Sequence, residues 1–118
     1  MDISKYTIQI NSKIEDVIAK IKANGYRTVV VLDGKKIMGV VSEGDILKAI
    51  INGADKKNLI NKYVQINYKF LNKKDINEAA SLIKKYNINL IPIVDGDMNI
   101  IDLITIGDVF ENILTTNE

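Results

Sequence analysis

An internal repeat constrains the fold of this chain more than any other feature of its sequence. Two segments have apolar residues at positions i, i+3, i+4 and i+7, which is the spacing of an amphipathic helix. The first set is Ile14, Val17, Ile18 and Ile21, and the second, 62 positions later, is Ile76, Ala79, Ala80 and Ile83. Ser12 and Asp75 stand where the two helices would be capped, and Gly25 stands where the first would end. The spacing therefore predicts two equivalent helices.

The segments that follow these helices repeat in the same register. Residues 28–32 form a continuous β-branched apolar run, Asp33 and Gly34 signal a tight turn, and residues 37–41 form a second apolar run. Residues 90–96 repeat the first run and its turn signal, and a one-residue insertion in the second turn changes the offset from 62 to 63. A turn tolerates such an insertion. The pattern predicts two hairpins, of which we expect the first to be buried on both faces.

A further helix is expected at the end of each unit. Its apolar positions are Ile46, Leu47, Ile50 and Ile51 in the first unit, and Val109, Phe110, Ile113 and Leu114 in the second. With a short strand at residues 6–10, the unit becomes a β-α-β-β-α repeat of an α/β (α+β) fold. Neither repeat is large enough to bury its sheet alone, so the two should pack with pseudo-twofold symmetry. We expect residues 1–61 to form the first repeat with its linker, and residues 62–118 to form the second.

A polar corner recurs where each hairpin passes into its last helix. Residues 39–45 have the sequence Gly-Val-Val-Ser-Glu-Gly-Asp, and residues 102–108 share its hydroxyl-x-Gly-Asp ending. Ser/Thr-x-x-Asp before a helix is also a capping box, which stabilises the helix by about 0.5 to 2 kcal/mol with no ligand. Gly44 and Gly107 contribute nothing to a cap, and glycine lowers helix stability by up to about 1 kcal/mol. The repeated glycine favours a binding site, and a purely structural cap is the alternative.

The residue types at the corner suit a nucleoside phosphate. Ser42 and Thr105 place a hydroxyl at a helix N-terminus, where free N–H groups and the helix dipole favour a phosphate. Asp45 and Asp108 lie one helical turn further on, where a carboxylate can accept hydrogen bonds from a vicinal diol such as ribose. The corner therefore predicts, in each repeat, one residue that binds phosphate and one residue that binds ribose.

Composition narrows the chemistry that the chain can perform. The 118 residues include no Cys and no His, which excludes thiolate catalysis, disulfides, imidazole acid–base chemistry and the usual zinc ligands. Asp95, Asp97 and Asp102 do not have the spacing of an EF-hand loop, so no metal site is expected. No nucleophile is paired with a candidate base. We therefore expect the chain not to be an enzyme.

Charge and hydropathy bear on partners and location. Sixteen basic and fifteen acidic residues leave a net charge of +1, and no basic patch is present to bind nucleic acid. No apolar run approaches the roughly 18 to 20 residues that a membrane span needs, and the N-terminal residues lack a signal-peptide pattern. We expect a cytoplasmic protein with neither nucleic-acid nor membrane partners.

The two repeats and both corners resemble a pair of CBS (cystathionine-β-synthase) domains, the tandem arrangement also called a Bateman module. The strand at residues 90–95, Leu-Ile-Pro-Ile-Val-Asp, is typical of that family. The resemblance implies a regulatory module that binds an adenosine ligand such as AMP, ATP or S-adenosylmethionine in the cleft between the repeats. It implies phosphate ligands at Ser42 and Thr105, ribose ligands at Asp45 and Asp108, and residues bordering the bases at Thr28, Val29, Ile91 and Pro92.

Two acidic residues depart from the family pattern near the corners. Glu43 lies beside the first phosphate position and Asp102 beside the second, where Gly39 stands in the first repeat. Like charges at that range disfavour a polyphosphate unless a cation or a basic side chain compensates. We therefore expect a nucleoside or a monophosphate in preference to ATP. Arg27, at the rim of the expected cleft, is suited either to contacting phosphate or adenine or to remaining a solvated side chain.

The resemblance also bears on assembly. Residues 24–50 and 65–70 are similar to CBS pairs that precede sugar-phosphate nucleotidyltransferase domains, which implies a fused or partner enzyme of that kind. Apolar residues exposed on the last helix of each repeat, including Ile51, Phe110 and Leu114, predict a homodimer. The alternative function is a structural dimerisation module that binds no ligand.

Overall fold

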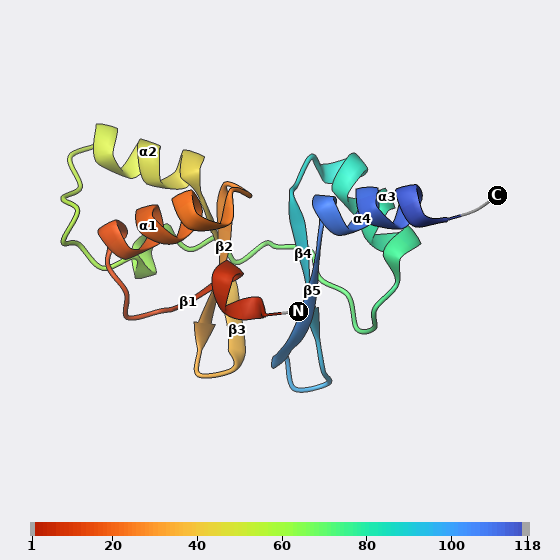
Figure 1. Cartoon of the computed structure of the whole chain (residues 1–118). Helices are drawn as coiled ribbons and strands as arrows, with labels where there is room; N and C mark the ends of the chain where they lie inside the picture. The colour runs from red at the N-terminus through yellow and green to blue at the C-terminus, as the bar shows by residue number, and fades with distance from the viewer. Residues whose placement is uncertain (1, 117–118) are drawn as a thin grey trace. The chain divides into compact units, whose positions relative to one another are not determined.

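The computed structural model describes residues 2–116, which divide into two compact units between Tyr68 and Lys69 (Figure 1). The sequence placed this boundary between residues 61 and 62. The intervening segment belongs with the first unit because its chain pairs with the hairpin there. The Gln65 N–H donates to the Val40 carbonyl at 2.8 Å, and the Val40 N–H donates to the Gln65 carbonyl at 3.0 Å.

The first unit is a three-stranded sheet with two helices, and it has the predicted β-α-β-β-α order. Its elements are η1 (Ile3–Tyr6), β1 (Thr7–Gln9), α1 (Ile14–Asn24), β2 (Thr28–Asp33), β3 (Lys36–Ser42), α2 (Glu43–Ile51) and η2 (Asn61–Tyr63). The strand order is β1-β2-β3, with β1 parallel and β3 antiparallel to the central strand β2. The central strand is thus hydrogen-bonded on both edges, which suits its continuous apolar sequence.

Both helices of the first unit contribute to one hydrophobic core with the sheet. Alternate residues of β2, Val29 and Val31, lie in this core together with residues of α1 and α2. The remaining members are Ile14, Val17, Ile21, Val41, Ile46, Ala49 and Ile60. The chain passes directly from the end of β3 into α2, and the first polar corner lies at this junction.

The start of α1 differs from the prediction. Lys13, not Ser12, precedes the helix, and its backbone N–H donates to the Asp16 carboxylate at 2.9 Å. A carboxylate in the first turn of α1 therefore accepts a hydrogen bond from the N–H of the residue before the helix. The same contact is found at both corners. The predicted end is confirmed, because Gly25 adopts the left-handed conformation with φ of 72°.

The second unit repeats the first with a shorter opening strand. Its elements are α3 (Ile76–Tyr86), β4 (Leu90–Val94), β5 (Ile100–Thr105) and α4 (Ile106–Thr115), and Leu71 forms a single parallel bridge to Ile93. The predicted cap Asp75 accepts hydrogen bonds from the N–H groups of Asn77 and Glu78, both at 3.1 Å. A second core joins α3 to the hairpin through Leu71, Ala79, Ile83, Ile91, Ile93 and Ile104.

Both hairpins have an irregularity in their strand pairing, and it falls at equivalent positions of the repeat. The register of the first hairpin shifts between Val31 and Leu32, and that of the second shifts between Ile93 and Val94. Val31 pairs with Gly39, and Ile93 pairs with Asp102. The glycine and the aspartate that differ between the two corners therefore occupy equivalent positions beside equivalent irregularities.

Burial of the first hairpin differs between its strands. Residues 29–32 of β2 are all buried, as predicted, but β3 alternates, with Ile37 and Val41 buried and Met38 exposed. The expectation of burial on both faces was therefore wrong for β3. The reason is that a strand with one partly solvated face buries only every second residue. Among residues 2–116, no helix has the length and apolar character required to cross a bilayer.

Candidate functional site

The first corner lies where β3 ends at Ser42 and α2 begins at Glu43. The Ser42 Oγ accepts a hydrogen bond from the Asp45 N–H at 3.1 Å and donates one to Asp45 Oδ2 at 2.9 Å. The Ser42 N–H also donates to Asp45 Oδ2, at 2.9 Å. This is a complete capping box, which satisfies N–H groups that the first turn of a helix leaves unpaired.

The second corner has the same geometry where β5 passes into α4. The Thr105 Oγ1 accepts from the Asp108 N–H at 3.0 Å, and the Thr105 N–H donates to Asp108 Oδ2 at 2.8 Å. Thr105 is 2% exposed, whereas Ser42 is half-buried. The predicted hydroxyl and carboxylate are thus brought together in both units.

These contacts bear on the two alternatives that the sequence left open. Each cap uses the Oδ2 atom of its aspartate, and the Oδ1 atom takes no part in the cap. A carboxylate has acceptor sites on both oxygens, so the same side chain can cap a helix and accept a hydrogen bond from a ligand. Capping and nucleotide binding are therefore compatible at Asp45 and Asp108.

The two glycines of the first corner have different physical roles. At Gly39, which has φ of 156°, an added Cβ would overlap the carbonyl oxygen of Gln65 and lie 2.6 Å from Val64 Cγ1. At Gly44 the nearest atom to an added Cβ would be Ser42 Oγ at 3.6 Å, an ordinary contact. The fold therefore requires glycine at position 39, but neither the fold nor the cap requires it at position 44.

The residues predicted to border the bases lie at the start of each hairpin. Thr28 pairs with Ser42 across the strands, and its hydroxyl donates to the Val41 carbonyl at 3.0 Å. Val29 and Ile91 are fully buried and belong to the two hydrophobic cores. Their side chains therefore lie inside the cores, and only their backbone is available for contact. Pro92 is also buried, and its carbonyl accepts from the Leu71 N–H at 3.0 Å.

Arg27 lies at the first corner in a conformation that is uncommon for a residue with a side chain. Its φ is 66°, and its carbonyl accepts from the Glu43 N–H at 2.9 Å. Its guanidinium contacts Glu43 Oε1 at 2.6 Å, and its side chain is 70% exposed. Arg27 thus pairs with one of the two acidic residues that depart from the family pattern.

The other acidic residue also has a basic partner. Lys74 Nζ lies 3.3 Å from Asp102 Oδ2. Each corner therefore combines two carboxylates with one basic side chain, Arg27 in the first and Lys74 in the second. Sequence reasoning did not single out Lys74, because it lies 28 positions before its partner.

Gln65 is the second residue that sequence reasoning missed as part of the site. Its side-chain Nε2 donates to Asp45 Oδ1 at 3.2 Å, although the two residues are 20 positions apart. No local motif links them. The signal in the sequence was Gly39, whose missing side chain admits the chain at residues 64–65.

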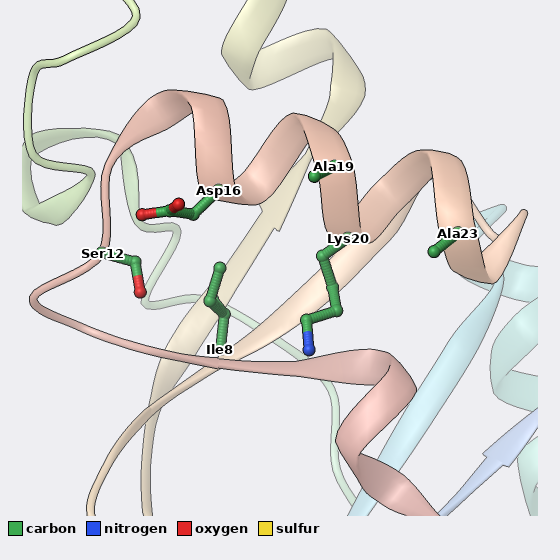
Figure 2. A pocket seen from close by; sticks show the side chains of 6 residues that line it. All are labelled: Ile8, Ser12, Asp16, Ala19, Lys20 and Ala23. Carbon is green, nitrogen blue, oxygen red and sulfur yellow. The ribbon is translucent and has the colours of Figure 1, made fainter.

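Two other features lie outside the corners. Asp95 Oδ1 accepts from the N–H groups of Asp97 and Asn99, at 2.9 and 3.0 Å, so this carboxylate orders its own turn. Within residues 2–116, no group of three or more acidic side chains is placed to hold a metal ion. An open groove of about 420 Å³ lies between β1 and α1. Figure 2 shows the side chains that line it, which are those of Ile8, Ser12, Asp16, Ala19, Lys20 and Ala23. The groove contains none of the predicted nucleotide ligands.

One family model matches this chain, in two separate segments. The CBS domain model matches residues 1–52 and 72–115. The uncharacterized protein MJ1426 of Methanocaldococcus jannaschii is 28% identical to this chain, over 96% of this chain and 89% of its own length.

Solved structures share the fold across most of the chain. The CBS domain protein PAE2072 from Pyrobaculum aerophilum has a TM-score of 0.73 at 19% identity, covering 94% of this chain and 92% of its own. The CBS domain pair/ACT domain protein TM0892 from Thermotoga maritima has a TM-score of 0.77 at 16% identity, covering 92% and 88%. CBSX2 has a TM-score of 0.75 at 20% identity, covering 92% and 87%. With the family model matched once in each repeat, the chain belongs to the CBS domain family, as a tandem CBS domain pair.

Proposed function

We propose that this CBS pair is a regulatory module that binds an adenine nucleotide, preferably AMP or a similar ligand, and that it is not itself catalytic. The observation that carries the proposal is the pairing, in both repeats, of a hydroxyl-capped helix N-terminus with a carboxylate whose Oδ1 is not used by the cap. Two proteins of similar fold support the choice of ligand, because PAE2072 and CBSX2 were both solved in complex with AMP. The cleft expected between the repeats stays a prediction.

Each part of the corner has a chemical role in this proposal. The N–H groups of Glu43 and Ile106 already donate to the carbonyls of the residues just before β2 and β4, and those of Asp45 and Asp108 donate to the capping hydroxyls. We therefore assign the phosphate contact to the N–H groups of Gly44 and Gly107, together with the hydroxyls of Ser42 and Thr105. The Oδ1 atoms of Asp45 and Asp108 accept hydrogen bonds from the ribose hydroxyls. Backbone groups beside Thr28 and Ile91 border the adenine. Gly44 lets the ligand approach the backbone of the first helical turn.

Charge supports a monophosphate over a triphosphate. Arg27 and Lys74 each offset one acidic residue, and this leaves one carboxylate in excess at each corner. Repulsion between unit charges a few ångströms apart near a protein surface costs on the order of 1 to 4 kcal/mol. Arg27 and Lys74 reduce the repulsion between the acidic residues of each corner and a bound phosphate. The carboxylates of Asp45 and Asp108 still disfavour the additional negative charge of a triphosphate. S-Adenosylmethionine, which is cationic, is compatible with the same corner.

Isothermal titration tests the proposal directly. Purified protein is titrated with AMP, ADP, ATP, adenosine and S-adenosylmethionine, and AMP is expected to bind more tightly than ATP. Asp45→Ala and Asp108→Ala should each reduce AMP binding while the circular dichroism spectrum stays that of the wild type. Absence of both heat and a melting-temperature shift with all five ligands would favour the alternative, a structural module whose corners serve only as caps.

We propose further that the module forms a homodimer through its exposed apolar helices. Leu47 and Ile51 on α2 are 60% and 74% exposed, and Phe110 and Leu114 on α4 are 57% and 80% exposed. Large apolar side chains grouped on a helix favour burial against a partner. Sedimentation at several concentrations should give a dimer mass, and Leu114→Glu should shift the equilibrium toward the monomer. A monomer at all concentrations would contradict this assignment.

The module is expected to regulate an enzyme that is fused to it or bound to it. We propose a fused or partner sugar-phosphate nucleotidyltransferase, because residues 24–50 and 65–70 are similar to CBS pairs that precede such domains. Adding AMP should then change the nucleotidyltransferase activity of the complex. A partner enzyme of another class, recovered with this module, would overturn this assignment and leave nucleotide binding intact.

A further inference from the structure

The Gln65 side chain is hydrogen-bonded to Asp45 Oδ1, the atom that the ribose of the proposed ligand would contact. Its side-chain amide donates to Asp45 Oδ1 at 3.2 Å, while the capping contacts hold Asp45 Oδ2. Both oxygens of this carboxylate are therefore engaged within the first unit. A ribose hydroxyl that donates to Oδ1 must share that atom with the Gln65 amide or displace it.

The backbone of Gln65 is held in place while its side chain is exposed. Reciprocal hydrogen bonds with Val40, at 2.8 and 3.0 Å, fix the peptide beside β3. Gly39 makes this approach possible, because a side chain at that position would overlap the Gln65 carbonyl oxygen. The amide is thus anchored close to Asp45, and rotation about its own side-chain bonds is enough to release the carboxylate.

The second corner lacks this arrangement. Asp102 stands where Gly39 stands in the first unit, and its carboxylate contacts Lys74 at 3.3 Å. The Asp108 carboxylate has the same capping contact as Asp45, with the Thr105 N–H donating to Oδ2 at 2.8 Å. The difference between Gly39 and Asp102 therefore separates a corner that admits the backbone of Gln65 from a corner that has a charged side chain at the equivalent position.

We propose that the Gln65 side chain is an internal competitor for the ribose site at Asp45, and that it makes nucleotide affinity differ between the two corners. This inference rests on the proposed function. The amide donates to Oδ1 in the ligand-free protein, and the ribose hydroxyl takes over this hydrogen bond as the amide rotates away. A hydrogen bond from an exposed, neutral side-chain amide to a half-buried carboxylate has a net contribution of about 1 kcal/mol, so Gln65 should weaken AMP binding at the first corner by about fivefold.

The test isolates the first corner and removes the competitor. Asp108→Ala disables the second corner, and AMP is titrated into this variant with and without Gln65→Ala. The added substitution should tighten the remaining AMP site about fivefold. Asn67→Ala, which changes an exposed residue of the same segment, is the matched control and should leave the affinity unchanged. With Asp45→Ala in place of Asp108→Ala, the Gln65 substitution should have no effect.

Three other results overturn the inference. An unchanged affinity after Gln65→Ala excludes competition, and a weakened affinity makes Gln65 a ligand contact instead. In both cases AMP still binds, so the proposed function survives. Absence of AMP binding to the wild-type protein overturns both proposals together.

A measurement on the wild-type chain covers the case in which Asp108→Ala does not fold. The Nε2 proton resonances of Gln65 are followed by NMR during an AMP titration. They should shift as the first corner fills, and Asp45→Asn should shift them in the absence of ligand. Resonances that stay constant throughout would exclude an amide that leaves Asp45 on binding.

Discussion

Substitution of Gly39 by alanine tests how the first corner is assembled. The added Cβ would overlap the carbonyl oxygen of Gln65 and lie 2.6 Å from Val64 Cγ1. The first of these atoms belongs to the backbone, so the clash cannot be relieved by rotating a side chain. The residue also has φ of 156°, which an L-residue rarely adopts. Either the strand distorts or residues 64–65 leave the edge of β3.

The expected destabilisation follows from those two outcomes. Holding alanine in this backbone conformation costs about 1 to 3 kcal/mol. Detaching the segment instead removes the two hydrogen bonds between Val40 and Gln65, each with a net contribution of about 0.5 to 1.5 kcal/mol. It also exposes Val64, which packs against the first core. Because the chain takes the less costly outcome, the substitution should lower the free energy of unfolding by about 1 to 3 kcal/mol.

Urea unfolding followed by circular dichroism measures this change. With a slope of about 1.5 kcal/mol per molar urea, the midpoint should fall by about 0.7 to 2 M. Gly44→Ala is the matched control, because its added Cβ has only an ordinary contact at 3.6 Å. A fall of less than about 0.3 M for Gly39→Ala would refute the argument that close backbone approach requires glycine here.

The remaining predictions concern the caps, the proposed ligand and one ion pair. Gly44→Ala should raise the free energy of unfolding by about 0.5 to 1 kcal/mol, because alanine favours helix, and should weaken AMP binding about tenfold in a calorimetric titration. Unchanged AMP affinity would mean that the ligand does not approach this backbone. Thr105→Ala should lower stability by about 1 kcal/mol in urea, whereas Thr105→Ser should retain most of it; equal losses would contradict a hydroxyl cap. The hydrogen bond from Lys57 to Glu15 raises the pKa of Lys57 above its ordinary value of 10.5, so the pair stabilises the fold below that pH and the contribution is lost as pH rises through the raised pKa. Glu15→Gln should therefore reduce stability at about pH 8 and have a much smaller effect above the raised pKa of Lys57, and an equal loss in both ranges would exclude the charge interaction.

The sequence by itself determined the features that depend on neighbouring residues. Helix spacing, β-branched runs and turn residues specified two β-α-β-β-α units, because these patterns report which face of a local element is buried. Both capping boxes were also predictable. Their hydrogen bonds join residues three positions apart, such as Ser42 and Asp45, and the backbone of a first helical turn brings such residues together in any context.

Only the tertiary structure decided which partners the carboxylates at the corners have. The Gln65 contact to Asp45 and the Lys74 contact to Asp102 join residues 20 and 28 positions apart, and they depend on how a later or earlier segment packs beside a strand. The same packing turned the Val29 side chain into the core and left β3 half-solvated. Such contacts have no local sequence signal, because a side chain's partners are set by strand pairing and not by its neighbours. The repeat therefore predicted two equivalent corners, and packing around Gly39 made them different.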